Sequence, residues 1–216
     1  MTNGMEIRGN TELDISCGPC QLGKSLRTVS RKPQPRPDHP FDKIHVDVVG
    51  KITPVGIGKH QWGLLITDGA TTARWGYTFK EKNEASGMLI RFIHHVKNQY
   101  GQNIKCIRFD NGSEYGGDQA LHFMIEHGIA LEPTVPYTLE QDGIAKRSFR
   151  TVFERARTTA IDYKIPKFLW LELFHGIVYV ANRTATSCVK GMTPYEALRK
   201  AIYPDKPCRP SVKHLR

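Results

Sequence analysis

The chain has 216 residues, of which 39% are hydrophobic and 24% are charged, so its size and composition suit one globular domain with a short appendage. It contains no apolar run long enough to cross a membrane, and its first residues lack the basic and apolar segments of a secretion signal, which argues against membrane insertion and export. The formal charge of +10 attracts polyanions and disfavours acidic partners, so nucleic acid is the expected partner, although scattered surface charge would give the same total.

The cysteines indicate the compartment. There are five of them, an odd count, scattered at positions 17, 20, 106, 188 and 208. This is unlike the dense disulfide framework of a small secreted domain. We therefore expect a reducing, intracellular compartment, either the nucleus or the cytoplasm.

Residues 24–40 differ from the rest of the chain. The segment KSLRTVSRKPQPRP has five Lys or Arg and three Pro, a composition typical of an extended linker that can lie along phosphates, although most such linkers are merely solvated. The linker separates residues 1–23 from a patterned region at 41–204 that we expect to form the domain core. Residues 205–216 are expected to be a tail.

The hydrophobic pattern after residue 40 predicts strands and helices in a definite order. Short apolar runs bounded by Gly and Pro predict three adjacent antiparallel strands, and helices at the usual spacing then alternate with further strands. The expected elements are strands at 44–50, 61–68 and 74–79, a helix at 81–100, a strand at 105–110, a helix at 118–127, a strand at 129–134 and a long helix from about Gly143. This order predicts an α/β fold, a mixed five-stranded sheet flanked by helices.

The long helix carries an apolar stripe that we expect to face the core, formed by Phe149, Val152, Phe153, Ala156 and Ala160. Its other face is basic. A further helix is predicted at 167–183. A last helix opens at Thr193, where Pro194 fits the first turn and Glu196 can close a capping box.

Two aspartates belong to predicted strands. Asp47 lies in the middle of IHVDVVG, and its side chain leaves the face opposite to Val46 and Val48. Asp110 ends the strand KCIRFD and precedes a turn, so its carboxylate is expected at the carboxyl edge of the strand, where ligand sites often lie. Taken singly, each could be an ordinary hydrogen-bonded or turn-forming aspartate.

Several ordered segments resemble the integrases of copia-type retrotransposons, and they cover nearly the whole chain. They are HVDVVG with Asp47, DNGSEY with Asp110, PYTLEQDGIAKRSFRTVFERAR, FLWLELFHGIVYVANR and TPYEAL. The resemblance implies a ribonuclease-H-like fold and a function in DNA integration, in which an Asp, Asp, Glu trio holds two divalent metal ions. Asp47 and Asp110 match the two aspartates. Two such ions can activate the attacking oxygen and stabilise the leaving one.

The third carboxylate of the family pattern is replaced in this chain. In that pattern a Glu follows the second Asp after thirty-five intervening residues, and counting from Asp110 this position is Lys146, in a segment that aligns without a gap. An ammonium about 4 Å from a divalent ion is repelled by roughly 8 kcal/mol at an effective dielectric near 20, whereas beside Asp47 it offsets the repulsion between the carboxylates. We therefore expect Mg²⁺ or Mn²⁺ to bind weakly if at all, and strand transfer to be impaired or absent.

Two alternatives remain open. Glu140 or Asp142, just before the long helix, could move in as the third ligand and make the chain a working Mg²⁺-dependent integrase, although octahedral Mg²⁺ tolerates displaced ligands poorly. The chain could also be a domesticated DNA-binding or scaffold protein that uses its surface and not its site. A homo-oligomer is expected by resemblance, since integrases of the retroviral type work as multimers.

The start of the chain carries half of a zinc motif. Cys17 and Cys20 resemble the second half of the His-His-Cys-Cys module that precedes the core in these integrases. A structural zinc ion needs four ligands, and the first histidine is His39, beyond the linker. We interpret residues 1–23 as a remnant of that module, expect no zinc within this chain, and expect the chain to be a fragment of a longer polyprotein.

The long helix also carries a basic face. Lys146, Arg150 and Arg157 lie near one line at helical spacing, with Arg147 beside them. A solvated face would show the same pattern. Next to a phosphate-processing site, however, we expect Lys146, Arg147 and Arg150 to contact the backbone of double-stranded DNA with little sequence specificity.

Overall fold

The computed structural model of the chain describes residues 36–109, 118–133 and 143–206, with the backbone alone described at 118–119, 133 and 143–146. The chain divides into two compact units, Met1–Lys32 and Pro33–Arg216, and every described residue belongs to the second unit. Among the described helices, none is long and apolar enough to span a membrane.

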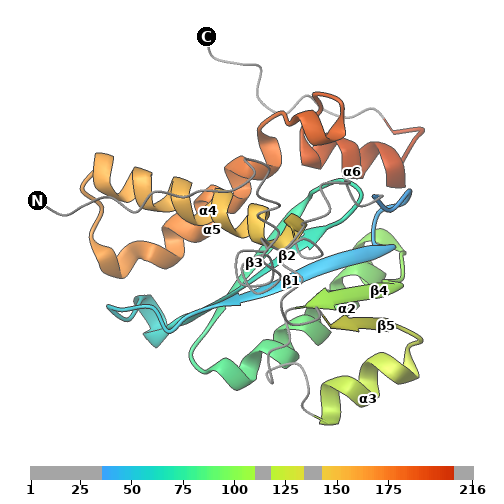
Figure 1. The fold of residues 1–216 in the computed structure, drawn as a ribbon, viewed down its shortest axis with the longest axis horizontal. Helices are drawn as coiled ribbons and strands as arrows, with labels where there is room; N and C mark the ends of the chain where they lie inside the picture. Colours follow the sequence, from blue (N-terminus) through green and yellow to red (C-terminus); the bar gives the residue numbers. More distant parts are fainter. Residues whose placement is uncertain (1–35, 110–117, 134–142, 207–216) are drawn as a thin grey trace, which may run out of the picture. The chain divides into compact units, whose positions relative to one another are not determined.

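A mixed five-stranded sheet forms the centre of this unit, with the strands in the order β3-β2-β1-β4-β5 (Figure 1). The strands are β1 Lys43–Val49, β2 Trp62–Asp68, β3 Arg74–Phe79, β4 Cys106–Phe109 and β5 Ala130–Pro133. The pairs β1–β2 and β2–β3 are antiparallel, and the pairs β1–β4 and β4–β5 are parallel. The expected α/β class and mixed sheet are confirmed.

Helices cover both faces of the sheet. The helices are α2 Ala85–Tyr100, α3 Asp118–Glu126, α4 Gly143–Asp162, α5 Trp170–Arg183 and α6 Pro194–Ile202. Short 3-10 turns occupy Ile57–Lys59, Lys82–Glu84, Lys167–Leu169 and Ser187–Val189. The helices α2 and α3 lie on one face, and α4 and α5 lie together on the other (Figure 1). Each of the predicted strands and helices is therefore present.

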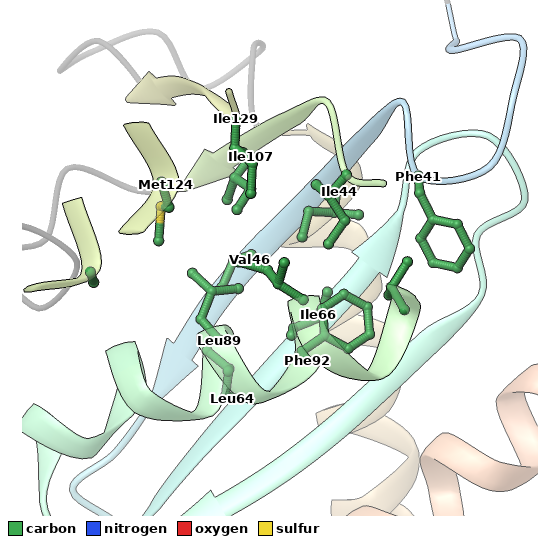
Figure 2. Packing of buried hydrophobic residues seen from close by; sticks show 14 of the residues in the cluster. Phe41, Ile44, Val46, Leu64, Ile66, Leu89, Phe92, Ile107, Met124 and Ile129 are labelled. Carbon is green, nitrogen blue, oxygen red and sulfur yellow. The ribbon is translucent and has the colours of Figure 1, made fainter. Parts of the chain in front are cut away.

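The larger hydrophobic core lies between the sheet and α2 (Figure 2). It forms because alternate residues of each strand point to the same face, while α2 presents one apolar stripe. The fully buried strand residues include Ile44, Val46, Leu64, Ile66 and Ile107, and the helix residues include Leu89, Phe92 and Val96. This face of the sheet is thus closed by close-packed hydrophobic side chains.

The second, smaller core joins the opposite face to α4 and α5. Its buried residues are Leu65, Val152, Phe174 and Val178. A close approach of Phe174 to the sheet depends on a glycine, since a Cβ added at Gly76 would lie 2.6 Å from Phe174 Cε1. The seating of α5 therefore requires the absence of a side chain at this point of β3.

The apolar stripe predicted for α4 is confirmed in its first half. Val152 is fully buried, and Phe149 and Phe153 pack against the same core. Ala156 and Ala160 are only half-buried and line an apolar groove between α4 and α5. The second half of the stripe thus lies along a groove that residues of α5 and Val49 of β1 also line.

The start of α6 follows the predicted capping box. Thr193 Oγ1 accepts a hydrogen bond from the Glu196 amide at 3.1 Å, and the Thr193 amide donates to Glu196 Oε2 at 2.9 Å. These bonds satisfy two backbone amides at the helix start. The local sequence alone was therefore sufficient to predict where this helix begins.

Candidate functional site

Asp47 lies in the central strand β1, on the face that α4 covers. Its partner across the β1–β2 pair is Leu65, which packs in one cluster with Val152 of α4, so Asp47 shares that face. Val46 belongs to the core on the α2 side. The prediction that Asp47 leaves the sheet opposite to Val46 is thereby confirmed, and the carboxylate is half-buried.

Asp110 lies outside the described residues, but the strands that lead to both aspartates are neighbours. In the parallel pair β1–β4 the last described partners are Val46 and Phe109. Asp47 and Asp110 are the next residues of the two segments. The strands that lead to these two aspartates therefore lie side by side in the sheet.

The beginning of α4 is fixed against the sheet close to Asp47. Ser148 is buried, and its Oγ accepts hydrogen bonds from Thr67 Oγ1 at 2.9 Å and from Arg74 Nε at 2.6 Å. Thr67 is the β2 partner of His45, two residues before Asp47. The backbone of Lys146 belongs to this first turn, whereas its side chain, Glu140 and Asp142 lie outside the described part of the chain.

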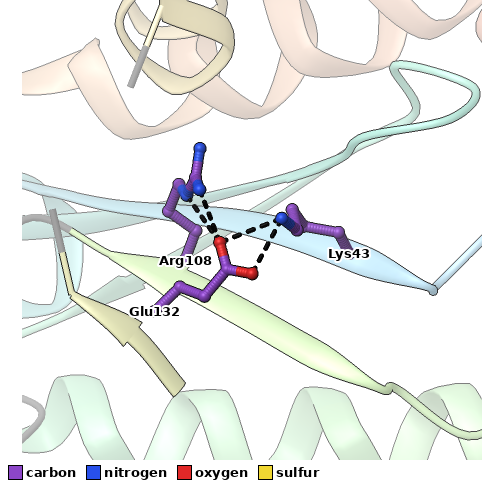
Figure 3. Close-up of polar contacts among 3 residues, drawn as sticks. All are labelled: Lys43, Arg108 and Glu132. Carbon is purple, nitrogen blue, oxygen red and sulfur yellow. Dashed lines mark hydrogen bonds and ion pairs between the residues drawn. The ribbon is translucent and has the colours of Figure 1, made fainter. Parts of the chain in front are cut away.

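An ion cluster lies on the same face of the sheet, across β1, β4 and β5 (Figure 3). Glu132 accepts hydrogen bonds from Lys43 Nζ at 2.9 Å and from Arg108 Nε at 3.0 Å. Partial burial acts to raise the pKa of Glu132, but hydrogen bonds from Lys43, Cys106 and Arg108 outweigh it and lower the pKa to about 2. Glu132 is therefore ionised at neutral pH and held by two cations.

His45 lies in β1 between Lys43 and Asp47 and is almost completely buried. Burial, together with the positive charges of Arg108 and Lys43, lowers the pKa of His45 to about 4. Among the described residues, neither ring nitrogen has a hydrogen-bond partner. The imidazole is consequently neutral at physiological pH and adds no charge beside Asp47.

The sequence analysis identified Asp47 and missed the other polar residues on its face. The alternation in Lys43-Ile-His45-Val-Asp47 was the available signal, because alternate strand residues share a face. The pairing of Arg108 with Glu132 carried no comparable signal, since it depends on which strand lies next to β4.

The arginines of α4, at positions 147, 150, 155 and 157, are exposed. Arg147 lines a cavity together with Arg74 and Arg155, whereas Arg157 lines the apolar groove between α4 and α5. Arg150 is exposed and lines neither of these two hollows. The expected contact of Lys146, Arg147 and Arg150 with DNA stays a prediction, since the Lys146 side chain lies outside the described part of the chain.

The predicted zinc half-site, Cys17 and Cys20, lies outside the described residues. Within the part of the chain that is described, no group of three or more His, Cys, Asp or Glu is arranged to hold a metal ion. Among the described residues, four histidines make aromatic ring contacts: His94, His95, His127 and His175. His94 packs edge-on against Phe123, and His127 stacks on the same ring at a centroid distance of 4.0 Å.

The fold has a counterpart among solved structures. A chain in the cryo-EM structure of the simian T-cell lymphotropic virus intasome in complex with PP2A regulatory subunit B56 gamma superposes with a TM-score of 0.67 at 16% sequence identity. The match covers 93% of this chain and 69% of that chain. The fold is therefore the ribonuclease-H-like fold, a mixed five-stranded sheet with flanking helices.

Curated relatives are polyproteins of retrotransposons. The chain is 30% identical over 168 residues to the Retrovirus-related Pol polyprotein from transposon TNT 1-94 of Nicotiana tabacum, a match that covers 78% of this chain and 13% of the relative. It is 26% identical to the corresponding protein of transposon RE2 of Arabidopsis thaliana and 25% identical to the Ty1-DR6 Gag-Pol polyprotein of Saccharomyces cerevisiae, each over 85% of this chain. The chain spans only 12% and 11% of the lengths of these two relatives. No protein-family model matches the chain.

Proposed function

We propose that the chain is an integrase-derived domain of a retrotransposon polyprotein that binds double-stranded DNA and has impaired or no strand-transfer activity. The ribonuclease-H-like fold and the similarity to retrotransposon Pol polyproteins support the integrase origin. The observation that carries the proposal is the parallel pairing of β1 with β4, the strands that lead to Asp47 and Asp110, together with the hydrogen bond that holds the beginning of α4 to β2. Lys146 occupies that start where the family pattern has a carboxylate.

Binding of DNA follows from charge near this site. Arg147 and Arg150 are exposed on α4, whose first turns are anchored near Asp47, and the chain has a formal charge of +10. Exposed guanidinium groups neutralise backbone phosphates without reading bases, so binding weakens as salt rises and tolerates different sequences. It needs no metal ion and survives chelation. Self-association into an oligomer is part of the proposal, by analogy with the intasome match.

Among the described residues, the donor atoms on this face do not suit a centre of two hard metal ions. Magnesium requires an octahedron of oxygen ligands. Glu132, on the same face as Asp47, is already bonded to Lys43 and Arg108. Asp47 and Asp110 are the remaining ligands in this proposal, with the ammonium of Lys146 in place of the third. We therefore derive no catalytic step that depends on Mg²⁺ or Mn²⁺.

A strand-transfer assay in Mg²⁺ tests the proposal, with the 216-residue chain, Lys146→Glu and the uncharged control Lys146→Gln. We expect no joined product from the parent or from Lys146→Gln, and a gain of product with Lys146→Glu. Duplex binding is measured for all three proteins, so that loss of DNA binding is distinguished from loss of chemistry.

Two results would contradict the proposal. Joined product from the parent would favour a working integrase, and Glu140→Gln and Asp142→Asn would then identify the third ligand. A parent that binds no duplex even at low salt would remove DNA binding from the function, leaving the scaffold interpretation.

A further inference from the structure

A cavity of about 410 Å³ lies between α4, the β2–β3 pair and the turn that follows α5. Four arginines line it: Arg36, Arg74, Arg147 and Arg155. We name it the arginine cavity. The remaining lining is rich in hydroxyl groups, contributed by Thr67, Thr72, Ser148, Thr151, Thr186 and Ser187 among others. No aspartate or glutamate is among the described residues that line it.

This lining suits a phosphate group. Guanidinium groups donate paired, charge-assisted hydrogen bonds to phosphate oxygens, and hydroxyl groups add further donors. A cation would be repelled by the four arginines, and an apolar ligand would leave their charges buried without partners. The chemistry of the cavity therefore selects an anion with several oxygens.

Arg74 is held in position within the cavity. Its Nε donates to Ser148 Oγ at 2.6 Å. Its backbone is bonded at both ends to the amide side chain of Asn182, with its N–H donating to Oδ1 at 2.8 Å and its carbonyl accepting from Nδ2 at 2.7 Å. In the described part of the chain, the two terminal amino groups of Arg74 make no hydrogen bond. They are the groups available to a ligand.

Within the described residues, no arginine of the cavity forms an ion pair with an aspartate or a glutamate. The ion pairs found among the described residues involve Lys43, Lys105 and Arg108, none of which lines the cavity. Burial lowers the pKa of Arg74, and the charge of Arg155 lowers it further. A bound anion would relieve this repulsion between like charges.

The thiol of Cys188 lies at the mouth of the same cavity and responds to its charge. The side chain is exposed, and its backbone carbonyl accepts a hydrogen bond from Arg36 Nη1 at 3.2 Å. Partial burial acts to raise the pKa of Cys188, but a hydrogen bond with Thr186 and the charges of Arg36 and Arg147 outweigh it, so that the net pKa is lowered. The reactivity of the Cys188 thiol therefore depends on whether an anion occupies the cavity.

The position of the cavity relates it to Asp47. Thr67, in its lining, pairs with His45, which is two residues from Asp47 on the same face of β1. Two residues of a strand span roughly 7 Å, and neighbouring strands lie roughly 5 Å apart, so Thr67 and Asp47 are diagonal neighbours on one face. We propose that the arginine cavity binds a phosphate group of a nucleic-acid backbone. The bound phosphate positions that nucleic-acid strand next to Asp47. This inference rests on the proposed DNA-binding function and names the site at which one phosphate is held.

The first experiment follows alkylation of Cys188 in the full chain by iodoacetamide, with mass spectrometry of the peptide that contains it so that the other cysteines do not contribute. The parent is tested alone, with a duplex oligonucleotide, and with inorganic phosphate. We expect the duplex to slow alkylation about tenfold at low salt, because a backbone phosphate covers the thiol and raises its pKa.

The second experiment measures duplex affinity across a salt series for Arg36→Gln with Arg155→Gln. Arg74 is left in place because it supports Ser148. The matched control removes two charges from the opposite side of the sheet, Arg91→Gln with Lys97→Gln, both exposed on α2. We expect the cavity variant to lose about tenfold in affinity and to lower the salt slope by about two, and the control to change little.

The outcomes separate the two proposals. A parent that binds no duplex overturns the proposed function. A parent that binds duplex while Cys188 reacts at an unchanged rate, with a cavity variant that binds like the control, overturns only the phosphate site. Protection of Cys188 by inorganic phosphate but not by duplex would make a free anion the occupant and overturn the assignment to a nucleic-acid backbone.

Discussion

The two faces of the sheet differ in what they carry. Toward α2, the strands present Ile44, Val46, Leu64 and Ile66, all completely or almost completely buried. Toward α4 and α5, the same strands present Lys43, His45, Asp47 and Thr67. The buried apolar cluster there has four members within the described ranges. One strand, β1, thus contributes hydrophobic residues to one face and polar residues to the other.

The difference shows how one sheet serves two purposes. Burial of apolar area on the α2 face stabilises the fold, and this contribution is independent of the residues opposite. The α4 face can therefore hold charged and polar groups that reduce stability, such as a buried neutral imidazole and arginines without described carboxylate partners. A sheet face that carries such polar groups depends on a well-packed hydrophobic core on the opposite face of the sheet.

The largest effect on the free energy of unfolding is expected from a substitution in the core between the sheet and α2. Phe92 is completely buried and contacts Trp75 at a centroid distance of 5.0 Å. Phe92→Ala should lower the free energy of unfolding by about 3–5 kcal/mol through lost burial and a residual cavity. Phe153→Ala, a half-buried aromatic of the α4 face, is the matched control and should cost less. Urea denaturation measures both, and equal losses would contradict the asymmetry between the faces.

The next largest effect on stability is expected from a change of charge at the start of α4. Lys146→Glu should make the stability of the chain dependent on Mg²⁺, because three carboxylates repel one another until a cation binds. At an ion concentration ten times its dissociation constant, the gain is about 1.4 kcal/mol by mass action. Thermal unfolding with chelator and with millimolar Mg²⁺ gives the comparison. A parent stabilised by Mg²⁺ as strongly as the variant would mean that Lys146 is not at the third-ligand position.

A smaller effect on the free energy of unfolding is expected from a substitution in the ion cluster of Lys43, Arg108 and Glu132. Because the pKa of Glu132 is lowered to about 2, its stabilising contribution is complete above its ordinary pKa of 4.5 and is lost as the pH falls toward 2. Glu132→Gln should cost about 1 kcal/mol at pH 7, since the cluster is partly exposed to solvent. The difference between parent and variant should shrink below pH 4.5. The variant keeps Lys43 and Arg108 charged. It also lowers the pKa of His45 further, because the charge of Glu132 acts to raise that pKa.

Urea midpoints measured at several pH values provide this test. A difference that stays constant between pH 7 and pH 3 would show that Glu132 does not depend on its ionised form for its contribution. Glu126→Gln, at an exposed position of α3, is a control for the loss of one negative charge.

The smallest effect on stability is expected from the exposed arginines of α4. Arg147→Ala with Arg150→Ala should change the free energy of unfolding by less than about 0.5 kcal/mol, as is usual for surface positions. The same variant should lower the salt slope of duplex binding by about two. Fluorescence anisotropy across a salt series measures the slope, and an unchanged slope would remove these residues from the DNA contact.

Much of the fold could be predicted because its signals are local. The start of α6 follows from Thr193, Pro194 and Glu196, whose contacts span only three residues. The strand with Asp47 and its face follow from the alternation of polar and apolar residues in β1. The mixed sheet follows from the order of elements, since short links permit antiparallel neighbours and helical crossovers permit parallel ones.

The site could be predicted only in part, because its contacts are distant in sequence. Arg74 and Ser148 are 74 residues apart along the chain and are joined by a hydrogen bond, and Arg36 reaches Cys188 across 152 residues. No periodicity within a single helix or strand reports such pairs. Asp110, Glu140 and Asp142, on which the metal hypothesis depends, lie outside the described residues and stay predictions.

The bond between Asn182 and Arg74 has a consequence for how the molecule behaves among its own copies. β3 lies at one edge of the described sheet, and the outer backbone groups of an edge strand can pair with a strand of another molecule. The Asn182 side chain occupies both the N–H and the carbonyl of Arg74, as a paired residue of another strand would. At this residue the edge offers no free backbone group, so pairing with a strand of another molecule cannot include Arg74 while the Asn182 bonds are in place.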